Sequence, residues 1–167
     1  FGEKMNVHIP MTPAQISNDE IKSELLLADT SYGQGQLLIN PIQQAVMYSA
    51  FANQGNIVYP QIIVAGGEKK KEGVISSSAA ELVTNSLIKT VEDVNGTAHQ
   101  LSTGDGTLAG KTGTAEIKEK QDTKGQENSF ILAYDTVDGK FLIVSMIEDV
   151  EGTSAVLKNK DFIQTLK

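Results

Sequence analysis

The chain contains no cysteine, which excludes disulfide bonds and thiolate metal sites. Long hydrophobic runs are also lacking, since none approaches the roughly 18 residues that a membrane-spanning helix needs. Positive charge is scarce, because 14 Lys and Arg stand against 21 Asp and Glu and give a formal net charge of −7. That balance argues against nucleic acid or an anionic membrane surface as a partner.

Metal-binding and phosphate-binding patterns are missing as well. His8 and His99 are isolated, without carboxylates at ligand spacing, so we predict no metal site and no cofactor. The turn Gly33-Gln34-Gly35 exposes backbone groups, but no lysine follows it at the spacing of a phosphate-binding loop.

What remains is a globular composition, with 40% hydrophobic and 21% charged residues. The 167 residues fit one ordinary domain, and we find no repeat, low-complexity tract or internal boundary. The chain opens at Phe1 without an initiator methionine, so we expect it to be part of a longer protein.

Two helices are predicted from their capping residues. The first begins at Asn40-Pro41, because Asn caps exposed N–H groups and proline at the first helical position has no N–H to lose; it ends at Gly55. A capping box that starts at Ser78 predicts a second helix, which continues to about Val94.

A third helix is predicted over 154–166. Its apolar stripe consists of Ala155, Val156, Phe162, Ile163 and Leu166. Residues 1–20 are expected to be irregular, and 99–101 to form one helical turn. The charged segment 118–127 is interpreted as a mobile hairpin loop, and the basic cluster 69–71 as a solvated turn.

Strands are predicted over 108–117, 129–135 and 141–147, as an antiparallel meander whose second turn passes through Asp138-Gly139. Residues 56–64 are expected to form an edge strand. Because 141–147 is apolar on both faces, it needs cover above and below. The predicted fold class is therefore α+β, an antiparallel sheet with helices on both faces.

The strand at 108–117 carries the most distinctive chemistry, in Lys111-Thr112-Gly113-Thr114. Thr112 and Thr114 share one face of a strand, and Gly113 has no side chain to keep another backbone at a distance. A substrate carboxylate has a cation and two hydroxyl donors here, and a main-chain N–H to polarise a carbonyl. We interpret this strand as a binding edge.

Several blocks together resemble a known family. They are Tyr32-Gly33-Gln34-Gly35, residues 37–43, residues 50–56 with Pro60, Lys111-Thr112-Gly113-Thr114-Ala115-Glu116, and Phe130. In this order and spacing they are similar to the C-terminal portion of the transpeptidase domain of a class B penicillin-binding protein. Residues 18–33 resemble most the low-affinity, β-lactam-resistant Gram-positive type.

The resemblance implies a serine D,D-transpeptidase that cross-links peptidoglycan stem peptides, is acylated by β-lactam antibiotics and sits in a membrane-anchored parent protein on the extracytoplasmic face of the bacterial membrane. It implies that Lys111 and Thr114 are catalytic, and that Thr112, Gly113 and Thr114 bind substrate. The Thr114 N–H would form half of an oxyanion hole. A supporting loop would consist of Gly33, Gln34 and Gly35.

Two family motifs are not found where the family has them. Ser-x-Asn is absent, and the literal Ser-x-x-Lys match, Ser86 to Lys89, falls within a predicted helix, so we interpret Ser86 as an ordinary helix residue. We therefore expect 1–167 to be the C-terminal portion of one transpeptidase domain, inactive alone. Its exposed apolar surface would favour a dimer or pairing with the missing N-terminal portion.

Two other functions remain open. One is a β-lactam sensor or another non-catalytic penicillin-binding relative. The other is a serine β-lactamase, which needs a base for deacylation. Glu116 follows the motif, but we interpret it as solvent-facing or paired with a cation, since nothing around it predicts the burial that would tune a base.

Overall fold

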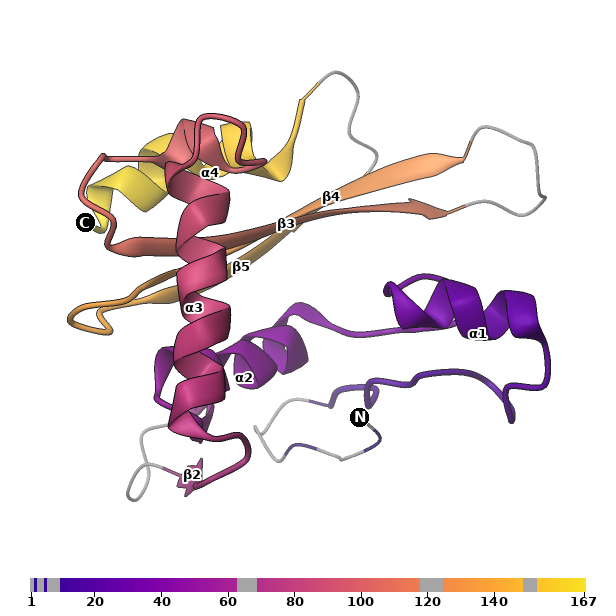
Figure 1. Ribbon diagram of the computed structural model, residues 1–167. Helices are drawn as coiled ribbons and strands as arrows, with labels where there is room; N and C mark the ends of the chain where they lie inside the picture. Colours follow the sequence, from indigo (N-terminus) through magenta and orange to yellow (C-terminus); the bar gives the residue numbers. More distant parts are fainter. Residues whose placement is uncertain (1, 3–4, 6–9, 63–68, 118–124, 149–152) are drawn as a thin grey trace.

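The computed structural model describes residues 2, 5, 10–62, 69–117, 125–148 and 153–167. Its central feature is an antiparallel sheet of three strands in the order β3-β4-β5 (Figure 1). The strands are β3 (Leu108–Ile117), β4 (Gln126–Asp135) and β5 (Leu142–Ile147). The predicted meander is confirmed, with Gly113 paired to Phe130 and Phe130 to Met146.

Helices lie on both faces of this sheet, as predicted for an α+β fold. They are α1 (Glu24–Ser31), α2 (Pro41–Ala52), α3 (Ser77–Glu92), α4 (Ala155–Thr165) and one turn of 3₁₀ helix, η1 (His99–Leu101). In Figure 1, α4 lies on one side of the sheet and α2 on the other, while α3 crosses the sheet on its β3 side.

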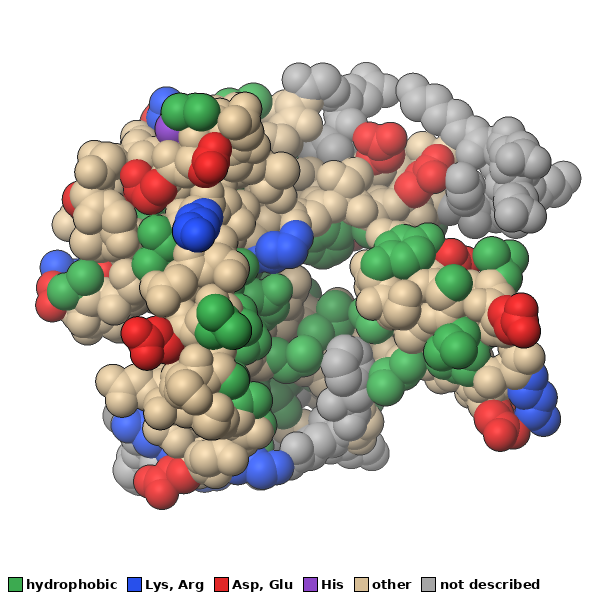
Figure 2. Space-filling view, viewed as in Figure 1, with side chains coloured by type: hydrophobic (Ala, Val, Ile, Leu, Met, Phe, Trp, Pro, Cys, Tyr) green, Lys and Arg blue, Asp and Glu red, His purple; other side chains and the backbone are tan. Residues whose placement is uncertain are grey.

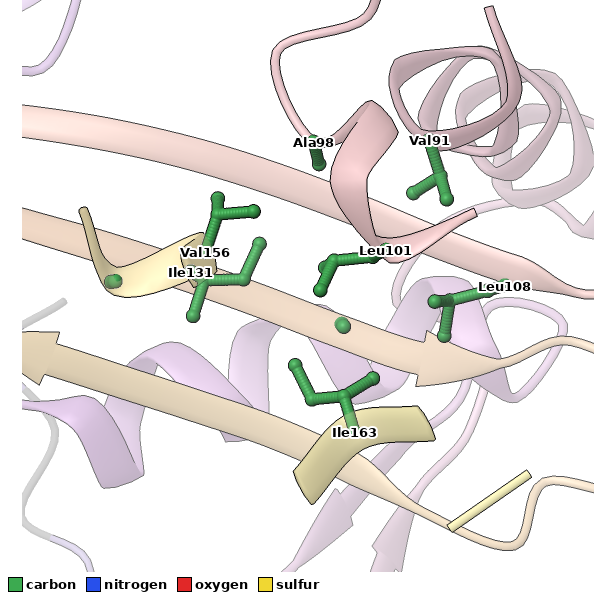
Figure 3. Close-up of a cluster of buried hydrophobic side chains, with 9 residues drawn as sticks. Val91, Ala98, Leu101, Leu108, Ile131, Val156 and Ile163 are labelled. Carbon is green, nitrogen blue, oxygen red and sulfur yellow. The ribbon is translucent and has the colours of Figure 1, made fainter. Parts of the chain in front are cut away.

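Two buried clusters attach the helices to the two faces. The first joins β3 and β4 to α4, η1 and the end of α3, through Val91, Ala98, Leu101, Leu108, Ile131, Val156 and Ile163 (Figure 3). The second contains Leu87, Ala109, Leu132 and Tyr134, with side chains of α2 packed against it. Together they hold the C-terminal half of α3 against β3, through Val91 in the first cluster and Leu87 in the second.

Local sequence determines where α2 and α4 begin. The Asn40 side chain accepts a hydrogen bond from the Gln43 N–H at 2.9 Å, with Pro41 at the first helical position. Ser154 caps α4 in the same way. Ala155, Val156 and Ile163 of the predicted stripe are buried.

Phe162, a member of that predicted stripe, is 57% exposed, so this part of the prediction is wrong. Ile163 lies seven residues after Val156, which returns it to the same side of the helix, whereas Phe162 is rotated by about 100° from Ile163. The buried face of α4 is therefore narrower than the stripe read from the sequence.

The start of α3 also differs from the prediction. Its N-cap is Ser76, whose hydroxyl accepts from the Ala79 N–H at 3.2 Å, and not Ser78. Ser78 instead lies in the first turn, within hydrogen-bond distance of Ser76. Two serines two residues apart offer competing caps, and the chain uses the earlier one.

The expected turn at 69–71 is a strand. β2 (Lys69–Lys71) pairs antiparallel with β1 (Ile57–Tyr59), and its three lysine side chains are exposed. β1 confirms part of the edge strand expected over 56–64. Some expectations concern residues that the structure does not describe. These are the rest of the expected edge strand and the turn after it at 63–68, most of the expected hairpin loop at 118–124, and His8.

α1 was not predicted, because the sequence shows only a short apolar run there. Ser23 caps this helix, and none of its residues is buried. Its boundaries are therefore set by the cap and by the turn that follows. In the part of the chain that the structure describes, no helix is long and apolar enough to cross a bilayer.

Candidate functional site

The motif residues lie on β3, which forms one edge of the sheet as far as its described strands go. The first three residues of β3 are buried, and the strand becomes accessible at Lys111. Lys111 and Thr114 are exposed and Thr112 is half-buried. The sequence-predicted binding groups are thus on an accessible stretch of strand that begins directly where the core ends.

The two threonines and the lysine project from opposite faces of β3. Thr112 pairs with Ile131, which belongs to the first buried cluster, and Lys111 pairs with Leu132, which belongs to the second. Paired residues share a face. The Lys111 ammonium returns to the strand edge, where it donates to the Thr112 carbonyl at 2.6 Å. The Lys111 ammonium and the Thr112 main chain therefore meet at the edge of the strand.

The predicted supporting loop contacts this edge directly. Gln34 Nε2 donates a long hydrogen bond, 3.4 Å, to the Thr114 carbonyl, across 80 residues of sequence. In an antiparallel pair, a residue directs both its N–H and its C=O to the partner strand or directs neither there. Since the Thr114 carbonyl accepts from Gln34, its N–H also points away from β4.

Gly33 and Gly35 give this loop its shape. Their φ angles are +86° and +75°, in the left-handed region that favours glycine. A Cβ on Gly35 would lie 3.0 Å from Leu26 Cδ1 in α1, whereas a Cβ on Gly33 would meet nothing within 4 Å. The turn therefore depends on glycine at both positions, and Gly35 also packs closely on α1.

The glycines of β3 have two different environments. A Cβ at Gly110 would lie 2.9 Å from Val91 Cγ2, so the close packing of α3 on β3 requires glycine there. At Gly113 an added Cβ would meet only Phe130, at 3.7 Å and beyond. Packing does not require a glycine at Gly113, because an added Cβ would make only ordinary van der Waals contact there.

Thr97 contacts a motif residue and was not singled out from the sequence. Its hydroxyl lies 2.7 Å from the Thr112 hydroxyl, and either oxygen can be the donor. The sequence predicted only that a helix ends at about Val94. The sequence shows that this helix ends shortly before the motif strand. The contact between Thr97 and Thr112, however, depends on how α3 crosses β3.

Ser86 and Lys89 both lie within α3, as the helix prediction implied, and Lys89 is in its last turn. The Ser86 hydroxyl donates to the Leu82 carbonyl at 3.0 Å, a bond within the helix. Glu116 is exposed, and its carboxylate accepts from the Gly125 N–H at 3.3 Å. Neither residue has the setting of a nucleophile or of a buried base.

No cluster of three His, Cys, Asp or Glu that could hold a metal occurs among the described residues. His99 makes a hydrogen bond of 3.1 Å between its Nδ1 and the Val91 carbonyl. It therefore serves to attach η1 to the end of α3.

An apolar hollow of about 500 Å³ lies between α2, β1 and β5. Its lining includes Ile42, Val46, Phe141, Leu142 and Val144. Figure 2 shows hydrophobic side chains on the face in view, among them those around a recess at its centre; the hollow itself is defined by its lining residues. This hollow lies apart from the motif residues, none of which lines it.

Comparison with known proteins identifies related sequences. Residues 1–164 match the family model described as the penicillin binding protein transpeptidase domain. Penicillin-binding protein 3 of Bacillus subtilis (strain 168) is 36% identical over 155 residues, which cover 90% of this chain and 23% of that protein. Penicillin-binding protein 2a of Streptococcus pneumoniae (strain ATCC BAA-255 / R6) is 34% identical over 87 residues, 46% of this chain and 12% of that protein.

Solved structures share the fold. A putative peptidoglycan glycosyltransferase from Atopobium parvulum DSM 20469 aligns with a TM-score of 0.65 and 25% identity, over 83% of this chain and 34% of that one. The TP domain of Burkholderia pseudomallei penicillin-binding protein 3 aligns with a TM-score of 0.58 and 21% identity, over 72% and 37%. The chain thus spans about a quarter of the length of the B. subtilis relative.

Proposed function

Because the chain belongs to the penicillin-binding protein transpeptidase family, we propose that the protein containing it is a peptidoglycan D,D-transpeptidase. A serine hydroxyl attacks the D-Ala–D-Ala carbonyl of one stem peptide and releases D-Ala. The amine of a second stem peptide then attacks the acyl-serine ester, which forms the cross-link and frees the serine. A β-lactam carbonyl takes the place of the first peptide and leaves the serine acylated.

The open edge of β3 is the observation that carries this proposal. The Thr112 and Thr114 hydroxyls bind the carboxylate of substrate or antibiotic, because both lie on one face and are accessible. Lys111 adds positive charge at the same edge. Gly113 lets the ligand backbone approach, because it has no side chain to keep another backbone at a distance.

The Thr114 N–H is proposed as one donor of the oxyanion hole. Its direction supports this role, since the neighbouring Thr114 carbonyl is directed off the sheet toward Gln34. Loss of one such donor typically lowers the rate about 100- to 1,000-fold. Gly33, Gln34 and Gly35 act indirectly, by holding the strand edge in position.

We place the nucleophilic serine and the Ser-x-Asn motif in protein outside this chain, which then forms the C-terminal portion of one transpeptidase domain. The Ser86 hydroxyl supports this placement, because it is bonded within α3. The parent protein is proposed to be membrane-anchored with this domain on the extracytoplasmic face. The apolar hollow beside α2 is consistent with pairing to the remaining portion or with a dimer of the isolated chain.

Labelling with penicillin tests the proposal. Intact mass spectrometry of the full-length protein is expected to show one covalent adduct, and peptide mapping is expected to place it outside 1–167. The isolated chain is expected to show none, and Ser86→Ala in the full-length protein is expected to label like the wild type. An adduct on the isolated chain, at Ser86 above all, contradicts the assignment.

The same experiment separates the alternatives. Continuous hydrolysis of penicillin would indicate a β-lactamase, and labelling without cross-linking of stem peptides would indicate a sensor. The exposure of Glu116 disfavours a β-lactamase that uses it as a buried deacylating base.

A further inference from the structure

The loop after α3 brings Thr97 to the motif strand. Its hydroxyl lies 2.7 Å from the Thr112 hydroxyl, although the two residues are 15 positions apart. We propose that Thr97 is a positioning residue that orients the Thr112 hydroxyl toward the carboxylate of substrates and β-lactams. This inference rests on the proposed function of the β3 edge.

The backbone holds Thr97 firmly on both sides. Before it, the Gly96 N–H donates to the Asp93 carbonyl at 2.8 Å, and a Cβ on Gly96 would lie 2.2 Å from the Thr90 carbonyl oxygen. After it, Ala98 is fully buried and its N–H donates to the Thr90 carbonyl at 3.1 Å. The position of the Thr97 backbone is therefore fixed by bonds that do not involve its side chain.

Hydroxyl chemistry determines the direction of the Thr97–Thr112 bond when a ligand is present. A hydroxyl has one hydrogen to donate and two lone pairs to accept with. A carboxylate only accepts, so Thr112 must give its hydrogen to the ligand. Thr97 must then be the donor in the pair, which leaves the Thr112 hydrogen directed at the carboxylate.

This arrangement contributes little to stability. Thr97 is exposed and Thr112 is half-buried, so water can satisfy both hydroxyls when the bond is broken. The loop is already attached through main-chain bonds and through buried Ala98. The benefit of the hydroxyl pair is therefore expected in ligand binding rather than in folding.

The test compares two β-lactams on the full-length protein, penicillin and its methyl ester, which lacks the charged carboxylate. The second-order acylation rate is measured for Thr97→Val, Thr97→Ser and a matched control, Thr165→Val, which removes an exposed hydroxyl from α4. Thr97→Val is expected to lower the rate with penicillin about 2- to 10-fold. The rate with the ester is expected to stay unchanged, and Thr97→Ser and Thr165→Val are expected to resemble the wild type.

Equal losses with both compounds, or wild-type rates for Thr97→Val, would overturn the positioning role while leaving the proposed function intact. If the wild type itself is not acylated by penicillin, the proposed function fails and this inference fails with it. Should Thr97→Val not fold, the acid-to-ester rate ratio of Thr97→Ala decides the question by the same criterion.

Discussion

Gly110 and Gly113 lie on the same strand, yet alanine should affect them in opposite ways. Neither has a positive φ angle, so the backbone at both positions accepts alanine. At Gly110 the new Cβ would lie 2.9 Å from Cγ2 of Val91, which is fully buried. Val91 is β-branched and helical, so its χ1 is largely restricted to one rotamer and the methyl cannot turn aside.

The expected loss follows from two opposing terms. Overpacking a core typically costs about 1–3 kcal/mol. Replacing glycine restricts the unfolded chain and returns about 0.4–1 kcal/mol. Gly110→Ala should therefore lower the free energy of unfolding by about 1–2 kcal/mol, which corresponds to a fall of roughly 2–8 °C in melting temperature for a domain of this size.

Gly113→Ala is the matched control for stability and the test variant for binding. Its new Cβ makes only ordinary contact with Phe130, so the free energy of unfolding should change by less than about 0.5 kcal/mol or rise slightly. Acylation of the full-length protein by penicillin should nevertheless fall on the order of 100-fold, because the added methyl displaces a ligand that approaches the strand there.

Urea denaturation and the acylation rate are measured for both variants, together with Val91→Ala and the double variant. Val91→Ala removes the obstructing methyl and alone should cost about 2 kcal/mol. Gly110→Ala combined with Val91→Ala should lose clearly less than the sum of the two single losses. Additive losses, or a Gly113→Ala variant as unstable as Gly110→Ala, would refute the assigned roles of the two glycines.

Three further predictions concern the hydroxyls, the supporting loop and a buried carboxylate. Thr114→Val should lower acylation by penicillin about 10- to 100-fold through loss of a hydrogen bond to a charged group, with an unchanged melting temperature because Thr114 is exposed. Gly35→Ala should lower the free energy of unfolding in urea by about 2 kcal/mol, since it adds crowding against α1 to the strain of a φ of +75°. Asp135→Asn should lower the free energy of unfolding by about 1–3 kcal/mol at pH 7, and this difference should shrink progressively as the pH falls below about 4.

The sign of the Asp135 prediction follows from its surroundings. Burial acts to raise the pKa of Asp135, but the backbone N–H groups of Lys140, Val137 and Asp138 outweigh it and hold the pKa below its ordinary value. A lowered pKa in the folded state stabilises the fold above the unfolded pKa of about 3.9, and this contribution is lost as the pH falls toward the folded value.

Each of these predictions has a control. Thr165→Val should leave acylation unchanged. Gly33→Ala should cost less than Gly35→Ala, because only its φ of +86° opposes the change. Asp138→Asn should change stability by less than about 0.5 kcal/mol, since its ion pair with Lys140 is exposed. A loss for Asp135→Asn that persists undiminished at pH 2 would contradict the carboxylate role.

Features fixed by neighbours in sequence were predictable. Asn40-Pro41 determines the start of α2 because the cap and the first helical residue are adjacent. The meander of β3, β4 and β5 follows from strand alternation and a short turn at Gly139, which has a φ of +62°. The motif strand was likewise predicted, because its sequence begins with apolar residues and continues with polar ones.

Features that depend on distant neighbours were missed. Lys69–Lys71 has poor strand propensity, and it becomes β2 because β1 offers it a partner. The half-burial of Thr112, the contact with Thr97 and the crowding at Gly110 all follow from the path of α3 across β3. No residue spacing within the motif encodes that path.

The most direct test of the central claim is a crystal structure of the full-length protein acylated by penicillin, in which the distances from the antibiotic carboxylate to the Thr112 and Thr114 hydroxyls are measured. We expect both distances to lie at about 2.5–3.0 Å, with the acyl carbonyl oxygen close to the Thr114 N–H. A carboxylate bound away from β3, or a β3 edge covered by the protein's own chain in that structure, would contradict the account.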